Sequence, residues 1–150
     1  MSERKKFYTR LQAVCSGGAH GNLFIVGIIH RYPDPTSDPR SVVLDAQITG
    51  KGLAWKVLLD GEKLFTDHYS HFNCMVPDPD GTLYIGEDDG FVRSQRGQVT
   101  VTKLRGQVKG SLECVYLGAG TQFVFGTADG WVAHFDKGTL ISKAQVGHEN

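Results

Sequence analysis

The stretch TLYIGEDDGFV, residues 82–92, is a short apolar run followed by a Gly, an Asp-Gly pair and a second apolar run. Forty residues later the chain reads QFVFGTADGWV, residues 122–132. Apolar runs of this length, bounded by Gly and Asp-Gly, favour strands joined by tight turns. The matched pairs at this offset are Gly86 with Gly126, Asp89 with Asp129, Gly90 with Gly130 and Phe91 with Trp131. Several special residues matched at one offset indicate an internal repeat.

The three cysteines extend this repeat towards the N-terminus. Cys74 and Cys114 stand twelve residues before their matched glycines, and Cys15 stands twelve residues before Gly27. We therefore expect the cysteines to be equivalent strand residues with reduced thiols, and not a disulfide framework or a metal site.

The predicted repeat units lie within a single domain of residues 1–150 and cover about 7–50, about 64–106 and about 108–147. The first unit carries a longer polar insertion, IIHRYPDPTSDPRSVVLDA, residues 28–46. The segment GKGLAWKVLLDGEKLF, residues 50–65, is expected to connect the first two units, with Trp55 in the core.

Units two and three each divide into four strands. The strands are predicted over 71–76, 82–87, 91–95, 98–104, 112–117, 122–127, 131–136 and 140–146. Pro and Asp-Gly between them are typical turn residues, and no stretch has a helical period with caps. The sequence therefore predicts an all-β fold.

The phrases DPDGTLYIGEDDGFV, residues 78–92, and TQFVFGTADGWVAHF, residues 121–135, resemble blades of the β-propeller repeat superfamily, which includes WD40-like and bacterial sensor-type repeats. The strict Gly-His and Trp-Asp signatures of WD40 repeats are absent. The resemblance implies four-stranded blades packed radially around a channel. A Gly inside a strand marks a close approach of another backbone, which suits the Gly of each unit.

Three blades are fewer than the four to eight that close a propeller. Two such arcs related by a two-fold axis would form a six-bladed ring, so we expect a homodimer. Alternatives are a partner chain that completes the ring, or a different all-β sandwich or barrel. The N-terminal segment RKKFYTRLQ, residues 4–12, could supply an outer strand to a neighbour.

Composition narrows the classes of partner. Lys plus Arg equals Asp plus Glu at 16 each, so the chain lacks the positive field that non-specific nucleic-acid binding requires. The longest apolar run, LFIVGII, is too short to cross a bilayer, and no apolar region follows the basic N-terminus. We expect a cytoplasmic protein without nucleic-acid or membrane partners.

The sequence offers little support for catalysis or metal binding. His68 and His71 are the weak metal candidates, since a site would need a third or fourth ligand. PDPDG and EDDG supply only part of a calcium loop and are more simply turns. No nucleophile elbow, P-loop, Cys-x-x-Cys or His-Glu-x-x-His occurs, so we expect no cofactor and favour a non-enzyme.

The expected function is a non-catalytic protein-binding module, a half-propeller scaffold or an immunity-type inhibitor, that recognises a partner protein through blade loops and the channel mouth. The candidate binding residues are Trp131, Phe91, His134, Arg93, Tyr32, Asp34 and Arg40. The first alternative is a carbohydrate-binding propeller lectin with Phe91 and Trp131 as sugar platforms, although packing between blades is the favoured role of both. The second alternative is a hydrolase or lyase that uses His68, His71 and acidic neighbours in the channel.

Overall fold

The computed structural model describes residues 7–17, 22–31, 40–65, 70–78, 80–104 and 106–146, and the strands in these ranges form three four-stranded antiparallel sheets. Sheet 1 contains β1 (Phe7–Gly17), β2 (Asn22–Arg31), β3 (Arg40–Thr49) and β4 (Gly52–Asp60), followed by the single helical turn α1 (Gly61–Leu64). Sheet 2 contains β5 (Phe72–Pro77), β6 (Leu83–Glu87), β7 (Gly90–Gln95) and β8 (Gln98–Lys103). Sheet 3 contains β9 (Leu112–Leu117), β10 (Gln122–Thr127), β11 (Trp131–Asp136) and β12 (Thr139–Gln145). The prediction of an all-β chain is confirmed.

The last hairpins of sheets 2 and 3 have the same turn. Arg96 and Gly97 join β7 to β8 with φ of 48° and 78°, and Lys137 and Gly138 join β11 to β12 with φ of 50° and 81°. Two-residue turns with positive φ at both positions match the right-handed twist of the flanking strands. The repetition seen in the sequence is thus a repetition of backbone geometry.

Strand register confirms two of the three cysteine equivalences. Cys74 lies opposite Gly86 and Cys114 lies opposite Gly126. In sheet 1, however, Cys15 lies opposite Phe24, while Gly27 lies opposite Leu11. The twelve-residue spacing in the first unit is therefore not a structural match, because the length of the turn between two strands sets their register.

Sheet 1 extends further along the chain than the first predicted unit. Residues 52–60, read from the sequence as part of a connector, form β4 and pair with β3. The described part of the N-terminal segment, from Phe7 onward, pairs with β2 of its own sheet. The idea that this segment serves as an outer strand of a neighbour is therefore wrong for those residues.

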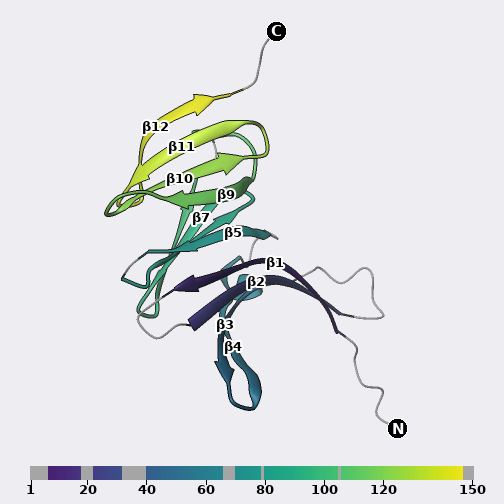
Figure 1. Ribbon diagram of the computed structural model, residues 1–150. Coiled ribbons are helices and arrows are strands. Elements are labelled where there is room, and N and C mark those ends of the chain that lie inside the picture. Colours follow the sequence, from purple (N-terminus) through teal and green to yellow (C-terminus); the bar gives the residue numbers. More distant parts are fainter. Residues whose placement is uncertain are drawn as a thin grey trace.

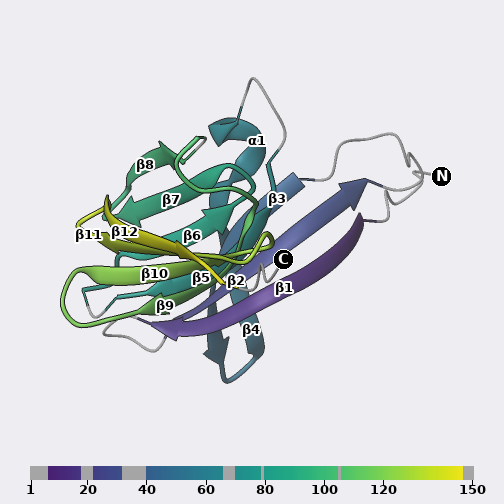
Figure 2. The same cartoon turned by 90° about the horizontal axis from the view of Figure 1, so that it is seen from above.

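The three sheets are stacked in chain order, with sheet 1 at one end and sheet 3 at the other (Figure 1). The first strands of successive sheets contact each other, β1 with β5 and β5 with β9. The second strand of each sheet also contacts the first strand of the next, β2 with β5 and β6 with β9. The view in Figure 2 shows β5 lying between β9 and the long β1–β2 hairpin. Both junctions between sheets therefore use the same strands.

Each junction has its own hydrophobic cluster. The cluster between sheets 1 and 2 includes Phe24, Val26, Val43, Phe72, Leu83, Ile85 and Val92. The cluster between sheets 2 and 3 includes Cys74, Tyr84, Phe91, Phe123, Phe125, Ala133 and Phe135. Successive residues of β6 and β7 belong to opposite clusters, as the pleat requires. Sheet 2 consequently has a neighbouring sheet on both faces, whereas sheets 1 and 3 each have one on a single face.

Gly86 is required where sheets 2 and 3 approach most closely. A Cβ at this position would lie 2.5 Å from Cys74 Sγ and 2.9 Å from Leu112 Cβ. The expectation that this Gly marks a close approach of another backbone is confirmed.

Among the described residues, no helix combines the length and apolar character needed to span a membrane.

Candidate functional site

The outer face of sheet 1, turned away from sheet 2, is apolar across three strands. Ala46 lies opposite both Leu23 and Trp55, and Leu44 lies opposite both Ile25 and Val57. Because directly paired residues project from the same face of a sheet, these side chains form one surface. Its members, which we call the sheet 1 outer face, are Leu23, Ile25, Leu44, Ala46, Ile48, Leu53, Trp55 and Val57.

Half of the sheet 1 outer face is open to solvent. Ile48 is 79% exposed, Trp55 61%, Leu53 52% and Val57 42%. These side chains cluster at the projecting end of the β3–β4 hairpin, which extends from the body of the molecule (Figure 1). A contiguous exposed apolar patch of this kind marks an interaction surface in a folded protein. Trp55, which was predicted to lie in the core, is instead its most prominent member.

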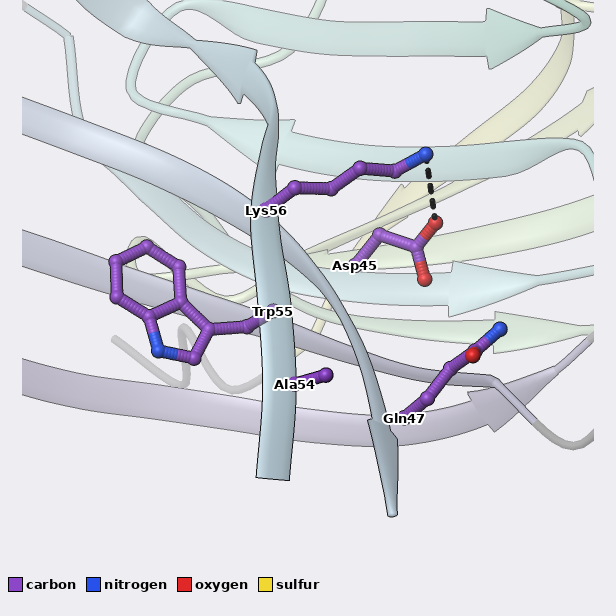
Figure 3. Close-up of a pocket in the computed structure, with 5 residues that line it drawn as sticks. All are labelled: Asp45, Gln47, Ala54, Trp55 and Lys56. Carbon is purple, nitrogen blue, oxygen red and sulfur yellow. Dashed lines mark ion pairs between the residues drawn. The ribbon is translucent and has the colours of Figure 1, made fainter. Parts of the chain in front are cut away.

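The opposite face of the same hairpin is polar. Figure 3 shows Asp45, Lys56 and Gln47 directed away from Trp55, with Lys56 Nζ 3.8 Å from Asp45 Oδ2. They line a hollow of about 240 Å³, together with Ala54 and Trp55. Asp45 Oδ1 is buried there without a hydrogen-bond partner. The hairpin is therefore amphipathic, with one face suited to apolar contact and the other to water.

A second polar feature lies at the edge of sheet 2 where β5 begins and β6 ends. The Asp88 carboxylate accepts hydrogen bonds from His71 N (3.0 Å) and Asn73 Nδ2 (3.0 Å), and its Oδ2 lies 2.9 Å from His71 Nδ1. Next to it, buried Glu87 accepts hydrogen bonds from Ser70 Oγ and from the Asp89 backbone (3.1 Å). We call these residues the sheet 2 polar cluster.

The pKa values of the two carboxyl groups of the sheet 2 polar cluster are shifted in opposite directions. Burial raises the pKa of Glu87 above its ordinary value, against the effect of the Ser70 hydrogen bond. Burial also acts to raise the pKa of Asp88, but the hydrogen bonds from Asn73 and His71 outweigh it and lower that pKa. Glu87 Oε1 is buried without a partner, which adds to the cost of ionising this group.

The sheet 2 polar cluster fastens strands together. His71 immediately precedes β5, and Asp88 lies in the turn between β6 and β7, so their contact joins the start of one strand to the turn that follows the next. In sheet 3, the positions forty residues on are Ser111 for His71 and Ala128 for Asp88, and their contact is a backbone hydrogen bond of 3.0 Å from Ala128 N to Ser111 O. The same junction is thus made in both sheets by different groups, which indicates a structural role for His71 and Asp88.

Two neighbouring hollows lie where the segment between sheets 2 and 3 meets their turns. The first, of about 360 Å³, is lined by Asp88, Asp89, Lys109, Asp129 and other residues of that segment. The second, of about 570 Å³, shares Lys109 and Asp129 and adds Trp131. Lys143 Nζ lies 5.4 Å from the centre of the Trp131 ring, and Trp131 Nε1 is buried without a hydrogen-bond partner.

The candidate binding residues predicted from sequence do not form one site. Phe91 is fully buried between sheets 2 and 3, which confirms its expected packing role. Trp131 packs against the same cluster from its rim. Arg93 donates to Gln95 on its own strand (2.8 Å), and His134 lies beside Gln122 (3.3 Å). Phe91 and Trp131 are also not register equivalents, since Val132 lies opposite Gly126 where Phe91 lies opposite Gly86.

Several predicted residues fall where the structure gives no account of them. Tyr32, Asp34 and His68 lie outside the described residues, and the side chain of Arg40 does as well. Within the described ranges, no group of three or more His, Cys, Asp or Glu side chains is arranged to hold a metal ion.

The turn considered for calcium binding is held by its own carboxylates. Asp78 Oδ1 accepts hydrogen bonds from Asp80 N and Thr82 N, both at 3.0 Å, and Asp80 Oδ1 accepts from Thr82 Oγ1 at 2.6 Å. Asp80 Oδ1 also accepts from Thr82 N at 2.9 Å, so Asp78 and Asp80 each hydrogen-bond the backbone two residues on. The interpretation of PDPDG as a turn is confirmed.

Comparison of the chain with protein-family models, with curated proteins and with solved structures finds no match.

Sequence reasoning missed the sheet 1 outer face, although the signal was present. Leu44, Ala46 and Ile48 alternate with Asp45 and Gln47 along β3, and Leu53, Trp55 and Val57 stand at alternate positions along β4. Such a pattern predicts a strand with one apolar face. It does not tell whether another sheet covers that face.

Proposed function

We propose that this protein is a non-catalytic protein-binding module, built as three blades of a β-propeller, whose ring is completed to six blades by a second copy. The observation that carries the proposal is the sheet 1 outer face with its exposed Trp55. Large aromatic side chains at the centre of an apolar patch are the usual energetic anchors of protein–protein interfaces.

The stacking of the sheets supports the propeller assignment. Each sheet runs in chain order, and each places its first strand against the first strand of the next. Propellers are built by such repetition around a central channel, with four-stranded sheets. The blade-like phrases at residues 78–92 and 121–135 fall in sheets 2 and 3, the sheets that most resemble each other.

A protein that binds through this surface would act as a scaffold or as an inhibitor of the immunity type. We also propose a cytoplasmic location, supported by the sequence, in which the cysteines are three in number and stand in apolar strand-like contexts. A stable complex with a protein encoded beside it would favour the inhibitor.

Site-specific photo-crosslinking tests protein binding because it captures a partner protein whatever its identity. Trp55 is replaced by a photoreactive phenylalanine analogue, and living cells that produce the full chain are illuminated. The matched control carries the analogue at Lys56, the next residue, which is 75% exposed on the opposite face. We expect protein adducts at position 55 and few at position 56. Equal labelling at both positions, or none at 55, would contradict the proposal.

Carbohydrate binding is the second candidate, and one observation favours it. Trp131 borders the hollow of about 570 Å³ beside Asp129 and Gln145, and its buried Nε1 has no partner. An indole beside polar groups is a suitable surface for a sugar ring. A glycan-array signal that is lost on Trp131→Ala but kept on Trp55→Ala would establish this function instead.

A further inference from the structure

The large apolar side chains exposed on this molecule are concentrated on its two terminal sheets. Of the nine among the described residues, five lie on the β3–β4 hairpin, three lie on or next to sheet 3, and only Val99 lies on the middle sheet. The three of sheet 3 are Val132 (40% exposed), Ile141 (56%) and Val146 (64%). The middle sheet exposes only Val99 among these side chains because it has a neighbouring sheet on each face.

The outer face of sheet 3 is defined by the register of its strands. Val124 lies opposite His134, and Val132 lies opposite Ala144, while the alternating residues Phe123, Phe125, Ala133 and Phe135 are buried against sheet 2. We call Val124, Val132, His134 and Ala144 the sheet 3 outer face. It is turned away from sheet 2, just as the sheet 1 outer face is.

The two outer faces of one chain lie at opposite ends of the stack, so they do not cover each other (Figure 1). The two internal junctions nevertheless follow one rule. The first and second strands of one sheet contact the first strand of the next, as β1 and β2 do with β5, and β5 and β6 do with β9. If the same rule continued past sheet 3, β9 and β10 would contact the first strand of a further sheet. If it continued before sheet 1, β1 would contact the first and second strands of a preceding sheet.

We infer that the occupant of the sheet 1 outer face is the sheet 3 outer face of a second copy, joined head to tail, with β9 and β10 of each copy against β1 of the other. The inference rests on the proposed function and specifies which surfaces of the two copies meet. Each chain carries both surfaces of this contact, so a ring of two copies contains the contact twice. Head-to-tail contacts of this kind close into a ring when the rotation between sheets permits.

The competing arrangement packs two sheet 1 outer faces against each other. That arrangement would cover Trp55 but leave Val132 and Ile141 in solvent on both copies. It would also pack sheet 1 against another sheet 1, whereas both internal junctions pack a sheet against the next sheet in the chain. The two arrangements differ in whether sheet 3 takes part, and mutations on sheet 3 separate them.

Complementation between two blocked variants tests the inference. Trp55→Glu places a charge on the sheet 1 outer face, and Val132→Glu places one on the sheet 3 outer face. Each variant alone is expected to have a mass of 16.4 kDa by analytical ultracentrifugation, where the unmodified chain has twice that mass. In a 1:1 mixture, sheet 3 of the Trp55→Glu copy and sheet 1 of the Val132→Glu copy are both unmodified, so dimers should reappear through that one junction.

Several outcomes would overturn the inference. A Val132→Glu variant that stays dimeric, or a mixture that stays monomeric, would show that sheet 3 does not occupy sheet 1. An unmodified chain that is monomeric at all concentrations would exclude a second copy, and masses that keep rising with concentration would show an open assembly in place of a ring. If either Glu variant fails to give the far-UV circular dichroism of the unmodified chain, Leu53→Lys and Ala144→Lys form the replacement pair, since Ala144 is exposed and lies opposite Val132.

The experiments distinguish a failure of the head-to-tail ring from a failure of the proposed protein-binding function. If the photo-crosslinks at position 55 lead to a different protein while the chain itself is monomeric, the head-to-tail ring is wrong and the protein-binding function stands. If the chain dimerises but position 55 gives no adduct with a second copy or with any other protein, the sheet 1 outer face is not the contact surface, and both proposals are wrong about that surface.

Discussion

Gly86 shows how much a single residue contributes to the packing of two sheets. A Cβ there would lie 2.9 Å from Leu112 Cβ and 3.2 Å from Leu112 O, so either sheet 3 shifts or the strand bends. We expect Gly86→Ala to lower the free energy of unfolding by about 1–3 kcal/mol, the usual cost of overpacking. Urea denaturation of the unmodified chain and the variant measures this change in the free energy of unfolding.

The control for that prediction is Gly50→Ala, because a Cβ at Gly50 meets no atom within 4 Å. The control should retain most of the stability of the unmodified chain. Equal losses in the two variants would mean that the close approach at Gly86 is not the cause.

Glu87 makes the stability of the molecule depend on pH. Burial raises its pKa from the ordinary value of 4.5, so the folded state binds this proton more tightly than the unfolded chain does. The free energy of unfolding should therefore decrease as pH rises from about 4.5 through the raised pKa. Asp88, whose pKa is lowered, has the opposite effect, and that effect is complete once the pH exceeds its ordinary value of 3.8.

We expect Glu87→Gln to remove this decrease, because an amide in the same place cannot ionise. Urea denaturation of both proteins at several pH values from 4 to 8 is the measurement, with the exposed Glu113→Gln as control. Parallel pH profiles for the unmodified chain and Glu87→Gln would show that Glu87 does not titrate in this interval.

At the scale of elements, Phe91 joins β7 of sheet 2 to the aromatic rings of sheet 3. The Phe91 ring lies 5.3 Å from Phe123 and 5.2 Å from Phe135, centre to centre, both edge to face. Phe91→Ala should lower the free energy of unfolding by about 3–5 kcal/mol, as cavity-forming changes in cores do. Val99→Ala on β8, where the side chain is 38% exposed, should change it by less than about 1 kcal/mol. Similar losses in the two variants would place Phe91 outside the core.

The β3–β4 hairpin was not foreseen, because residues 28–46 were read as a polar insertion and residues 50–65 as a connector with Trp55 in the core. The alternating apolar residues of β3 are typical of a strand with one apolar face. Trp55 lies on that face. It is exposed because sheet 1 stands at one end of the stack and neither of the other two sheets covers its outer face (Figure 1).

At the scale of the whole molecule, an assembly of two copies makes thermal stability depend on concentration. Partner binding to the folded state stabilises it by mass action. The unfolding temperature of the unmodified chain should rise as the protein concentration is raised, and that of Trp55→Glu should stay constant. Differential scanning calorimetry over a hundredfold range of concentration is the measurement, and a constant temperature for the unmodified chain would contradict dimerisation.

The strands of sheets 2 and 3 were predictable almost residue by residue. Three of the four strands in sheet 3 match their predicted ranges at both ends. These strands are short, apolar and bounded by Gly and Asp, so local preferences and the global fold agree. Sheet 1 was harder, because its longer strands and its insertion disturb the spacing on which the repeat rests.

The amino-acid sequence by itself determined that this chain is all-β, that it repeats, and where its turns fall, because strand alternation and turn chemistry are local properties. Only the tertiary structure decided which apolar faces are covered. Phe91 and Trp55 are both aromatic residues within strands, yet Phe91 is fully buried and Trp55 is 61% exposed. Burial depends on whether another sheet stacks on that face, and stacking is set by contacts between residues far apart in the chain.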